Sequence, residues 1–271
     1  MVESTKRSVK STGEKINLAE SKISRAGDAF NHLKLLAYAQ NGKGKTRLGA
    51  SGPKPFVVDC NERGSLSIRK FTEAQVFKAE TWTDIDLAFW YLKKGNHDRE
   101  TVVLDTVTSL AQLCMKFVLG DEVSRDPTKD PDMPTKREWG KVGELMRTVI
   151  LNFRNLDMHV IFLAQERRGY GDEDDDAPEV FPEVSPSVRS TLTASVDIIG
   201  RMYVKEVIRK TKGVKGEATK SVTVPEYRML IGPSERYVTK DRSEAGLPSV
   251  VRLGPEMDNL TKLIHRIEKG V

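Results

Sequence analysis

Residues 33–46, LKLLAYAQNGKGKT, join a short apolar run to a loop that ends in Gly-Lys-Thr. A strand followed by a glycine-bearing turn and a helix start is the arrangement in which successive backbone N–H groups surround a phosphate. The motif G-x-x-x-x-G-K-[ST] describes it, and the chain departs from that motif because Ala39 stands in place of the first glycine. Since the flanking strand and helix start are both predicted, we interpret the stretch as a working phosphate loop rather than a decayed one or a chance match.

The residue types in this loop have physical reasons. Gly42 and Gly44 stand where the chain turns tightly or where a Cβ would collide with phosphate. Lys45 is expected to reach the β- and γ-phosphates of a nucleotide, and the Thr46 hydroxyl to bind Mg²⁺. A small residue is tolerated at the strand exit. The predicted nucleotide-binding residues are Asn41, Gly42, Lys43, Gly44, Lys45, Thr46 and Arg47.

Apolar runs and amphipathic stretches alternate through the first two thirds of the chain. Strands are predicted at 33–38, 54–59, 101–105 and 159–165, and helices at 80–95, 109–120 and 137–156. A later hairpin is predicted from 196–204 and 221–232, and a closing helix at 257–270. This order predicts an α/β fold with a mostly parallel, doubly wound sheet and an antiparallel C-terminal extension. Residues 1–30 are predicted to be a polar N-terminal arm, and 31–271 a single domain.

Composition limits the cellular setting and the partners. The chain has no run of about 18 apolar residues, and its start lacks the apolar block of a signal peptide, so we expect a cytoplasmic protein with no membrane partner. The formal charge of +5 allows a polyanionic partner without requiring one. Basic residues gather at 204–220 and acidic residues at 171–179, and both runs are also compatible with solvated loops.

Polar residues follow the predicted strands where a nucleotide would lie. Asp105 ends the strand TVVLD, and an acidic residue there holds Mg²⁺ in phosphate-loop proteins, although such an Asp can also cap the next helix. Glu62, just beyond the second strand, is the candidate that orients the attacking water, with Asp59 as its rival. Gln165 ends the fourth strand and is either a sensor of the γ-phosphate or a strand-end hydrogen bonder.

The order of these parts resembles the RecA-like core ATPases, and most closely the short phage-encoded kind grouped with Sak-type single-strand annealing recombinases. The similarity runs from about Leu33 to Ile264. Its most specific pieces are NGKGKT, VVLDTVTSL, REWG, VDIIGRMYV and YVTKDRSEAGLP. The resemblance implies a RecA-like P-loop NTPase core, ATP with Mg²⁺, homo-oligomeric rings or filaments on single-stranded DNA, and a DNA-stimulated ATPase in recombination or repair. If the chain is phage-encoded, its compartment is the host cytoplasm.

The resemblance also gives expectations for DNA contact. RecA-like proteins usually contact DNA through the loop after the fourth strand, so the candidate DNA-binding residues are Arg167, Arg168, Tyr170, Arg209, Lys210 and Lys212. The acidic block at 172–176 departs from this expectation, because carboxylates near a phosphate backbone oppose binding. The alternative is a nucleotide-switched loader or assembly ATPase that acts on a protein. A single-strand-binding protein is a further candidate partner.

Lys240 and Arg242 form a late basic pair. If ERYVTK is a strand, these two side chains point the same way, and two adjacent cations are costly unless an anion meets them. We expect that anion to be the γ-phosphate held by a neighbouring subunit, and the resemblance supports this role, because relatives use a Lys-x-Arg pair in trans. The alternative is a surface pair bridged to Glu235 or Glu244.

Overall fold

The computed structural model describes residues 16, 17, 20, 21, 23, 32–71, 73–128, 130, 133–169, 178–211, 220–256 and 258–270, without the side chains of residues 210, 211 and 220. The chain divides into two units, Met1–Asn31 and His32–Val271, and the second contains the fold. Within the described residues, no helix combines the length and the apolar character that crossing a bilayer requires.

Six parallel strands form the centre of the sheet, in the order β7-β1-β5-β4-β2-β3. Their bounds are β1 (Lys34–Ala39), β2 (Pro55–Asp59), β3 (Gln75–Lys78), β4 (Thr101–Asp105), β5 (His159–Arg168) and β7 (Ile198–Thr211). β2 and β4 are buried throughout, as expected for parallel strands that are covered on both faces. β5 lies between β1, which precedes the phosphate loop, and β4, which ends in Asp105.

Antiparallel strands extend the sheet beyond β7. β8 (Lys220–Leu230) pairs with β7, and β10 (Val250–Leu253) pairs with β8. Two shorter strands lie beside the main order: β6 (Val180–Pro182) pairs with β5, and β9 (Lys240–Asp241) pairs with β7. This arrangement confirms the predicted α/β fold, a mostly parallel sheet with an antiparallel C-terminal extension.

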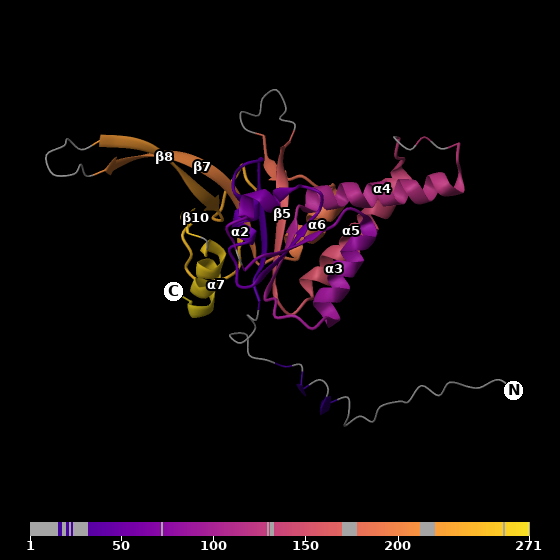
Figure 1. The fold of residues 1–271 in the computed structure, drawn as a ribbon, viewed down its shortest axis with the longest axis horizontal. Coiled ribbons are helices and arrows are strands. Elements are labelled where there is room, and N and C mark those ends of the chain that lie inside the picture. The colour runs from indigo at the N-terminus through magenta and orange to yellow at the C-terminus, as the bar shows by residue number, and fades with distance from the viewer. Residues whose placement is uncertain are drawn as a thin grey trace. The chain divides into compact units, whose positions relative to one another are not determined.

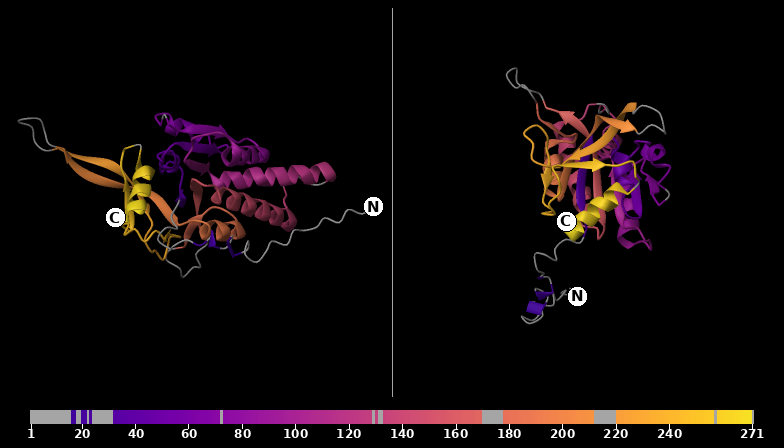
Figure 2. Two further views of the ribbon diagram at one scale, coloured as in Figure 1. Left: turned by 90° about the horizontal axis from the view of Figure 1, so that it is seen from below. Right: turned by 90° about the vertical axis from the view of Figure 1, so that its left-hand side faces the viewer.

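Helices cover both faces of the sheet, as Figures 1 and 2 show. One apolar core includes side chains from α3 (Trp82–Lys94), α4 (Val107–Arg125), α5 (Lys136–Arg154) and α6 (Pro186–Ala194). The other includes side chains from α2 (Lys45–Gly49) and α7 (Asn259–Lys269), and the short helix η2 (Gly64–Ile68) contributes Ile68 to it. Side chains alternate between the two faces of a strand, so Leu36 of β1 packs in the first core and Ala37 in the second.

Several predicted boundaries are wrong. The strand predicted at 159–165 continues as β5 to Arg168, and the strand predicted at 196–204 continues as β7 to Thr211. α4 continues to Arg125 instead of ending at Gly120, so the loop that follows is shorter than the predicted 121–136. Gly120 is helical, and the pair Asp121 and Arg125, whose Oδ2 and Nη2 lie 3.0 Å apart, supports the extra turn. The predicted strand ERYVTK is also wrong in extent, because β9 covers only Lys240–Asp241 and Tyr237 makes an isolated bridge with Val180.

The placement of α2 depends on a close approach at Gly49. A Cβ added there would lie 2.6 Å from Val103 Cγ1 on the sheet, closer than van der Waals contact permits. Gly49→Ala should therefore lower the free energy of unfolding by about 1–3 kcal/mol, and Val103→Ala in the same chain should recover part of the loss. Gly120→Ala is the control, since nothing lies within 4 Å of its added Cβ, and it should be neutral or stabilising. Urea unfolding measures all four proteins; equal effects of the two glycine changes would contradict this packing.

Candidate active site

The phosphate loop connects β1 to α2 and has the backbone geometry that requires glycine at two positions. Gly42 has φ +74° and Gly44 has φ +87°, both in the left-handed region. A Cβ on Gly44 would also lie 3.2 Å from the Tyr227 ring. Ala39, in contrast, is the last residue of β1, where it is buried and pairs with Gln165. Ala39 therefore occupies an extended position that does not need glycine, and the departure from the motif has no conformational cost.

Lys45, the first residue of α2, is only 7% exposed and points back under the loop. Its Nζ donates to the carbonyl oxygens of Ala39 at 3.0 Å and Gln40 at 3.1 Å, and to Gln165 Oε1 at 2.8 Å. Burial lowers the pKa of Lys45, and the carboxylates of Asp105 and Glu62 oppose this shift. The ammonium is thus held at the loop, in the position from which a phosphate would be contacted.

Thr46 and Asp105 meet at the edge of the sheet. Thr46 Oγ1 donates to Asp105 Oδ2 at 2.7 Å, and the Asp105 side chain ends a strand that is buried throughout. A hydroxyl and a carboxylate are oxygen ligands of the kind that Mg²⁺ prefers, with phosphates and water completing its shell. The two residues therefore fit the predicted metal site.

Glu62 lies at the centre of a polar cluster beyond β2. Its Oε1 accepts from Thr106 Oγ1 at 2.9 Å and from Ser109 Oγ, while both carboxylate oxygens lie 3.5 Å from Gln165 Nε2. Asp59 faces the same loop differently, since its Oδ1 accepts from the backbone N–H of Glu62 at 2.8 Å. Asp59 therefore holds the loop in place, and the Glu62 side chain reaches the other candidates.

Gln165 connects Lys45 of the phosphate loop to the polar cluster around Glu62. Its Oε1 accepts from Lys45, its Nε2 faces Glu62, and its backbone N–H donates to Thr108 Oγ1 at 3.1 Å. The position follows from sheet order, because β5 lies directly between β1 and β4. The structure thus brings Lys45, Glu62 and Gln165 together in one hydrogen-bonded group.

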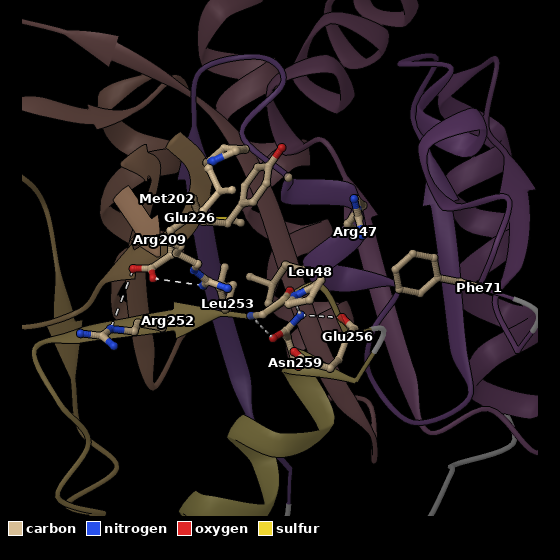
Figure 3. Close-up of a pocket in the computed structure, with 16 residues that line it drawn as sticks. Arg47, Leu48, Phe71, Met202, Arg209, Glu226, Arg252, Leu253, Glu256 and Asn259 are labelled. Carbon is tan, nitrogen blue, oxygen red and sulfur yellow. Dashed lines mark hydrogen bonds and ion pairs between the residues drawn. The ribbon is translucent and has the colours of Figure 1, made fainter. Parts of the chain in front are cut away.

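A cleft of about 310 Å³ opens over these residues. Of the seven predicted nucleotide-binding residues, all except Lys43 line it, together with Glu62, Asp105 and Gln165. A second cavity of about 370 Å³ adjoins it and shares Gly44, Arg47 and Tyr227 with it. Figure 3 shows Arg47 and Phe71 on one side of this second cavity, and Met202 and Glu226 on the other.

Other predicted residues lie outside this cleft. Lys240 is in β9, which pairs with the amino end of β7 at Ile198 and Ile199, whereas the phosphate loop follows the carboxyl end of β1. Its Nζ donates to the Thr193 carbonyl at 2.6 Å, and burial and then the charge of Arg242 lower the pKa of Lys240. Arg242 is exposed. Neither cation therefore faces the phosphate loop of its own chain.

The predicted DNA-binding residues lie on two elements. Arg167 and Arg168 are exposed at the end of β5, and Arg209 lies on β7, where its guanidinium is 3.7 Å from Glu226 Oε2. Tyr170, Lys212, the side chain of Lys210 and the acidic block 172–176 lie outside the described residues.

Three residues of the site were missed from the sequence. Thr106 and Ser109 bind Glu62, and a signal existed, because VVLDTVTSL places three hydroxyl groups within the four residues after Asp105. Tyr227 lies against Gly44 and lines both cavities. No local pattern indicates this role, since Tyr227 follows Gly44 by more than 180 residues and reaches it only through the order of strands.

Comparison with known proteins gives a family match. A family model described as an AAA domain matches residues 31–243. Among solved structures, the chain is similar to the flagellar accessory protein FlaH from Methanocaldococcus jannaschii, with 8% identity, a TM-score of 0.39, and coverage of 83% of this chain and 85% of that chain. It is also similar to the RadB recombinase, with 13% identity, a TM-score of 0.42, and coverage of 84% and 89%. No match was found among curated proteins.

Asp105 gives the site a pH dependence. Burial raises the pKa of Asp105 to about 6; the hydrogen bond from Thr46 and the charge of Lys45 oppose this shift, and the charges of Glu62 and Asp59 add to it. Because the ordinary pKa is 3.8, the folded protein binds more protons than the unfolded chain between pH about 4 and 6. This carboxyl therefore destabilises the fold as pH rises through that window, and the loss remains above it. Mg²⁺ needs the ionised form, so metal binding should weaken below pH about 6.

Asp105→Asn tests this linkage. The neutral amide still accepts from Thr46, so the free energy of unfolding should rise at pH 8 by on the order of 3 kcal/mol, and by about half of that at pH 5. Urea unfolding at the two pH values gives the difference. Asp86→Asn, an exposed change on α3, controls for the loss of charge. A destabilised Asp105→Asn protein at pH 8 would contradict the buried-charge account.

Proposed function

Because the chain belongs to the family described as AAA domain, we propose that it is an ATPase that hydrolyses ATP with Mg²⁺ and couples its nucleotide state to single-stranded DNA in recombination or repair. The observation that carries the ATPase is the hydrogen-bonded group of Lys45, Gln165 and Glu62 at the phosphate loop. It supports phosphoryl transfer to water, because a cation for the phosphates and a carboxylate for the water lie within one cleft.

Different residues of the loop and its surroundings bind the phosphates, the Mg²⁺ ion and the nucleoside. The backbone N–H groups from Gly42 to Thr46 receive the phosphates, and Lys45 exchanges its carbonyl partners for phosphate oxygens. Thr46 and Asp105 hold Mg²⁺, which neutralises charge on the phosphates. The nucleoside occupies the adjoining cavity, where Phe71, Tyr227 and Pro255 supply apolar surface.

Glu62 orients the attacking water in this proposal. Its carboxylate is already held by the hydroxyls of Thr106 and Ser109, so its direction is set before the reaction. Asp59 is the less suitable base, since one of its oxygens is engaged by the Glu62 backbone N–H. Gln165 contacts both Lys45 and Glu62 and so registers whether a γ-phosphate lies between them.

The DNA partner is supported by exposed cations next to this sensor. Gln165 and Arg167 are two residues apart on β5, and Arg167 and Arg168 project where the strand leaves the core. A basic pair at the end of a strand suits phosphate contacts, and such contacts release counterions and depend on salt. A movement of Gln165 on nucleotide binding would therefore be transmitted to the proposed DNA contacts, which begin only two residues further along β5.

Hydrolysis with and without single-stranded DNA tests this function. The wild-type protein should hydrolyse ATP faster with DNA, and Arg167→Ala with Arg168→Ala should lose the stimulation while the DNA-independent rate remains. Lys93→Ala with Lys94→Ala, an adjacent exposed pair at the end of α3, is the matched control. Lys45→Ala should lose at least about a hundredfold in turnover in both conditions, because it removes a charge from the transition state.

Two results would change the proposal. Equal turnover with and without DNA, together with no DNA binding at low salt, would favour the loader or assembly ATPase. Near-normal turnover in folded Lys45→Ala protein would mean that the loop does not catalyse hydrolysis. Lys54→Ala, which removes a lysine that is paired with Glu100 and whose side chain is 43% exposed, controls for the charge change.

Lys240 and Arg242 are proposed to complete the site of a neighbouring subunit. Both lie away from their own phosphate loop, and Arg242 is exposed, so a second copy is the available source of the phosphate. For Lys240 the role requires exchange of the Thr193 carbonyl for a phosphate oxygen. The protein would then act as an assembly, in which each site takes residues from two chains.

Mixing two inactive variants tests this sharing. Arg242→Ala and Lys45→Ala should each lack activity, whereas mixed assemblies contain some interfaces with an intact loop on one side and an intact basic pair on the other. Part of the ATPase rate should return, with a maximum at intermediate mixing ratios. Failure to recover any activity, in mixtures whose co-assembly is demonstrated by a tag on one variant, would rule out the shared site.

A further inference from the structure

β7 and β8 continue past the sheet as a two-stranded ribbon, which we call the arm (residues 205–211 and 220–226). Within the arm the strands pair with each other, from Lys205 opposite Glu226 to Thr211 opposite Lys220. The pairings with β1, β9 and β10 all end before this part. Among the described residues, both outer edges of the arm therefore lack a strand partner. Figures 1 and 2 show β7 and β8 running out together, away from the central sheet and the helices that cover it.

The root of the arm carries an excess of positive charge. Glu226 accepts from Arg228 Nε at 2.5 Å, and its carboxylate also lies 3.7 Å from Arg209 and 3.9 Å from Arg252. One carboxylate thus faces three guanidinium groups, and Figure 3 shows two of them, Arg209 and Arg252, beside Glu226. The side chains of Arg209 and Arg252 are 64% and 76% exposed, and their ion pairs with Glu226 are long. Both guanidiniums therefore retain donors for a second anion.

The arm also exposes apolar side chains. Ile208 is 73% exposed and Val222 45% exposed, and they lie on opposite faces of the ribbon, because Ile208 pairs with Thr223 and Val222 with Arg209. A two-stranded ribbon is marginally stable in water by itself, so one that projects with apolar side chains uncovered gains stability from a partner that surrounds it. The positive root indicates that this partner is a polyanion, and the arm's dimensions indicate its shape.

Two strands lie about 4.8 Å apart, so a ribbon with its side chains fits the major groove of B-DNA, which is about 12 Å wide, and is too wide for the minor groove at about 6 Å. The seven residues from Lys205 to Thr211 span about 23 Å, which is enough to cross the groove. We propose that the arm enters the major groove of duplex DNA, with Arg209 and Arg252 on the flanking phosphates and Val222, which lies on the same face as Arg209, against base edges.

This inference deepens the proposed function, since it rests on DNA as the partner and adds a duplex site to the single-strand site at Arg167 and Arg168. The two sites lie on different elements, the end of β5 and the outer part of the β7 and β8 pair. A protein with both sites could hold a single strand and a duplex at once, which is what pairing a strand with a homologous duplex requires.

Dimethyl sulfate footprinting on a short duplex tests the groove directly, because the reagent methylates guanine N7 in the major groove and adenine N3 in the minor groove. The full chain with a non-hydrolysable ATP analogue should protect guanine N7 and leave adenine N3 reactive. Arg209→Ala with Arg252→Ala should lose this protection and reduce the slope of log K against log salt by about 1.8, for two phosphate contacts. Arg125→Ala with Arg137→Ala, two exposed arginines on α4 and α5, is the matched control and should leave both unchanged.

Two further variants separate lost contacts from a collapsed arm. Arg209→Lys with Arg252→Lys keeps the charges and should keep most of the duplex affinity. Glu226→Gln removes the central carboxylate and should tighten duplex binding by at least about twofold, which a disrupted arm cannot do. Protection of adenine N3 instead of guanine N7, or equal duplex binding by the arm and control variants, would overturn the proposal.

The two DNA proposals fail separately. If the arm variants bind duplex DNA and protect guanine N7 like the control, while single-strand binding and ATPase stimulation are intact, only the duplex site is ruled out. Arm-dependent guanine protection without any single-strand binding would keep the duplex site and remove the proposed function.

Discussion

The parallel pairing of β1 with β5 is the constraint on which the site depends. It places Ala39 opposite Gln165, so the start of the phosphate loop lies beside Gln165 of β5. From this register follow the contact of Lys45 with Gln165 and the contact of Gln165 with Glu62. A shift of one residue would turn Gln165 to the other face of the sheet and separate these groups.

Burying charged side chains at this edge of the sheet costs free energy, and nearby hydrogen bonds offset part of that cost. Lys45 and Asp105 are both nearly inaccessible to solvent. Burial lowers the pKa of Lys45 and raises the pKa of Asp105, and each shift favours the neutral form. Hydrogen bonds from Thr46 to Asp105 and from Lys45 to two backbone carbonyls partly restore what water would supply. Such a site is poorly stabilised by itself and suited to a ligand that brings phosphates and a cation, because that ligand relieves the same electrostatic strain.

The antiparallel extension links this edge to the arm. Tyr227 and Met202 belong to β8 and β7, and both lie against Gly44 in the phosphate loop. The same two strands continue into the arm, so a nucleotide in the cavity lined by Tyr227 contacts the base of the element that we propose to bind duplex DNA. Under the two proposals, nucleotide binding and DNA binding would influence each other through this one pair of strands.

The sequence by itself determined the local features of this protein. The loop from Asn41 to Thr46, the strand end at Asp105 and the buried parallel strands were all predicted, because their signals are apolar runs, glycines and residue spacings of a few positions. The longer α4, the narrow extent of β9 and the roles of Thr106 and Ser109 needed the structure, since helix ends and polar contacts depend on neighbours from other segments. Only the tertiary structure decided the strand order, the place of Tyr227 beside Gly44 and the meeting of three arginines at Glu226. These contacts join residues far apart in the chain, and their geometry is set by sheet register and twist, which local residue preferences do not encode.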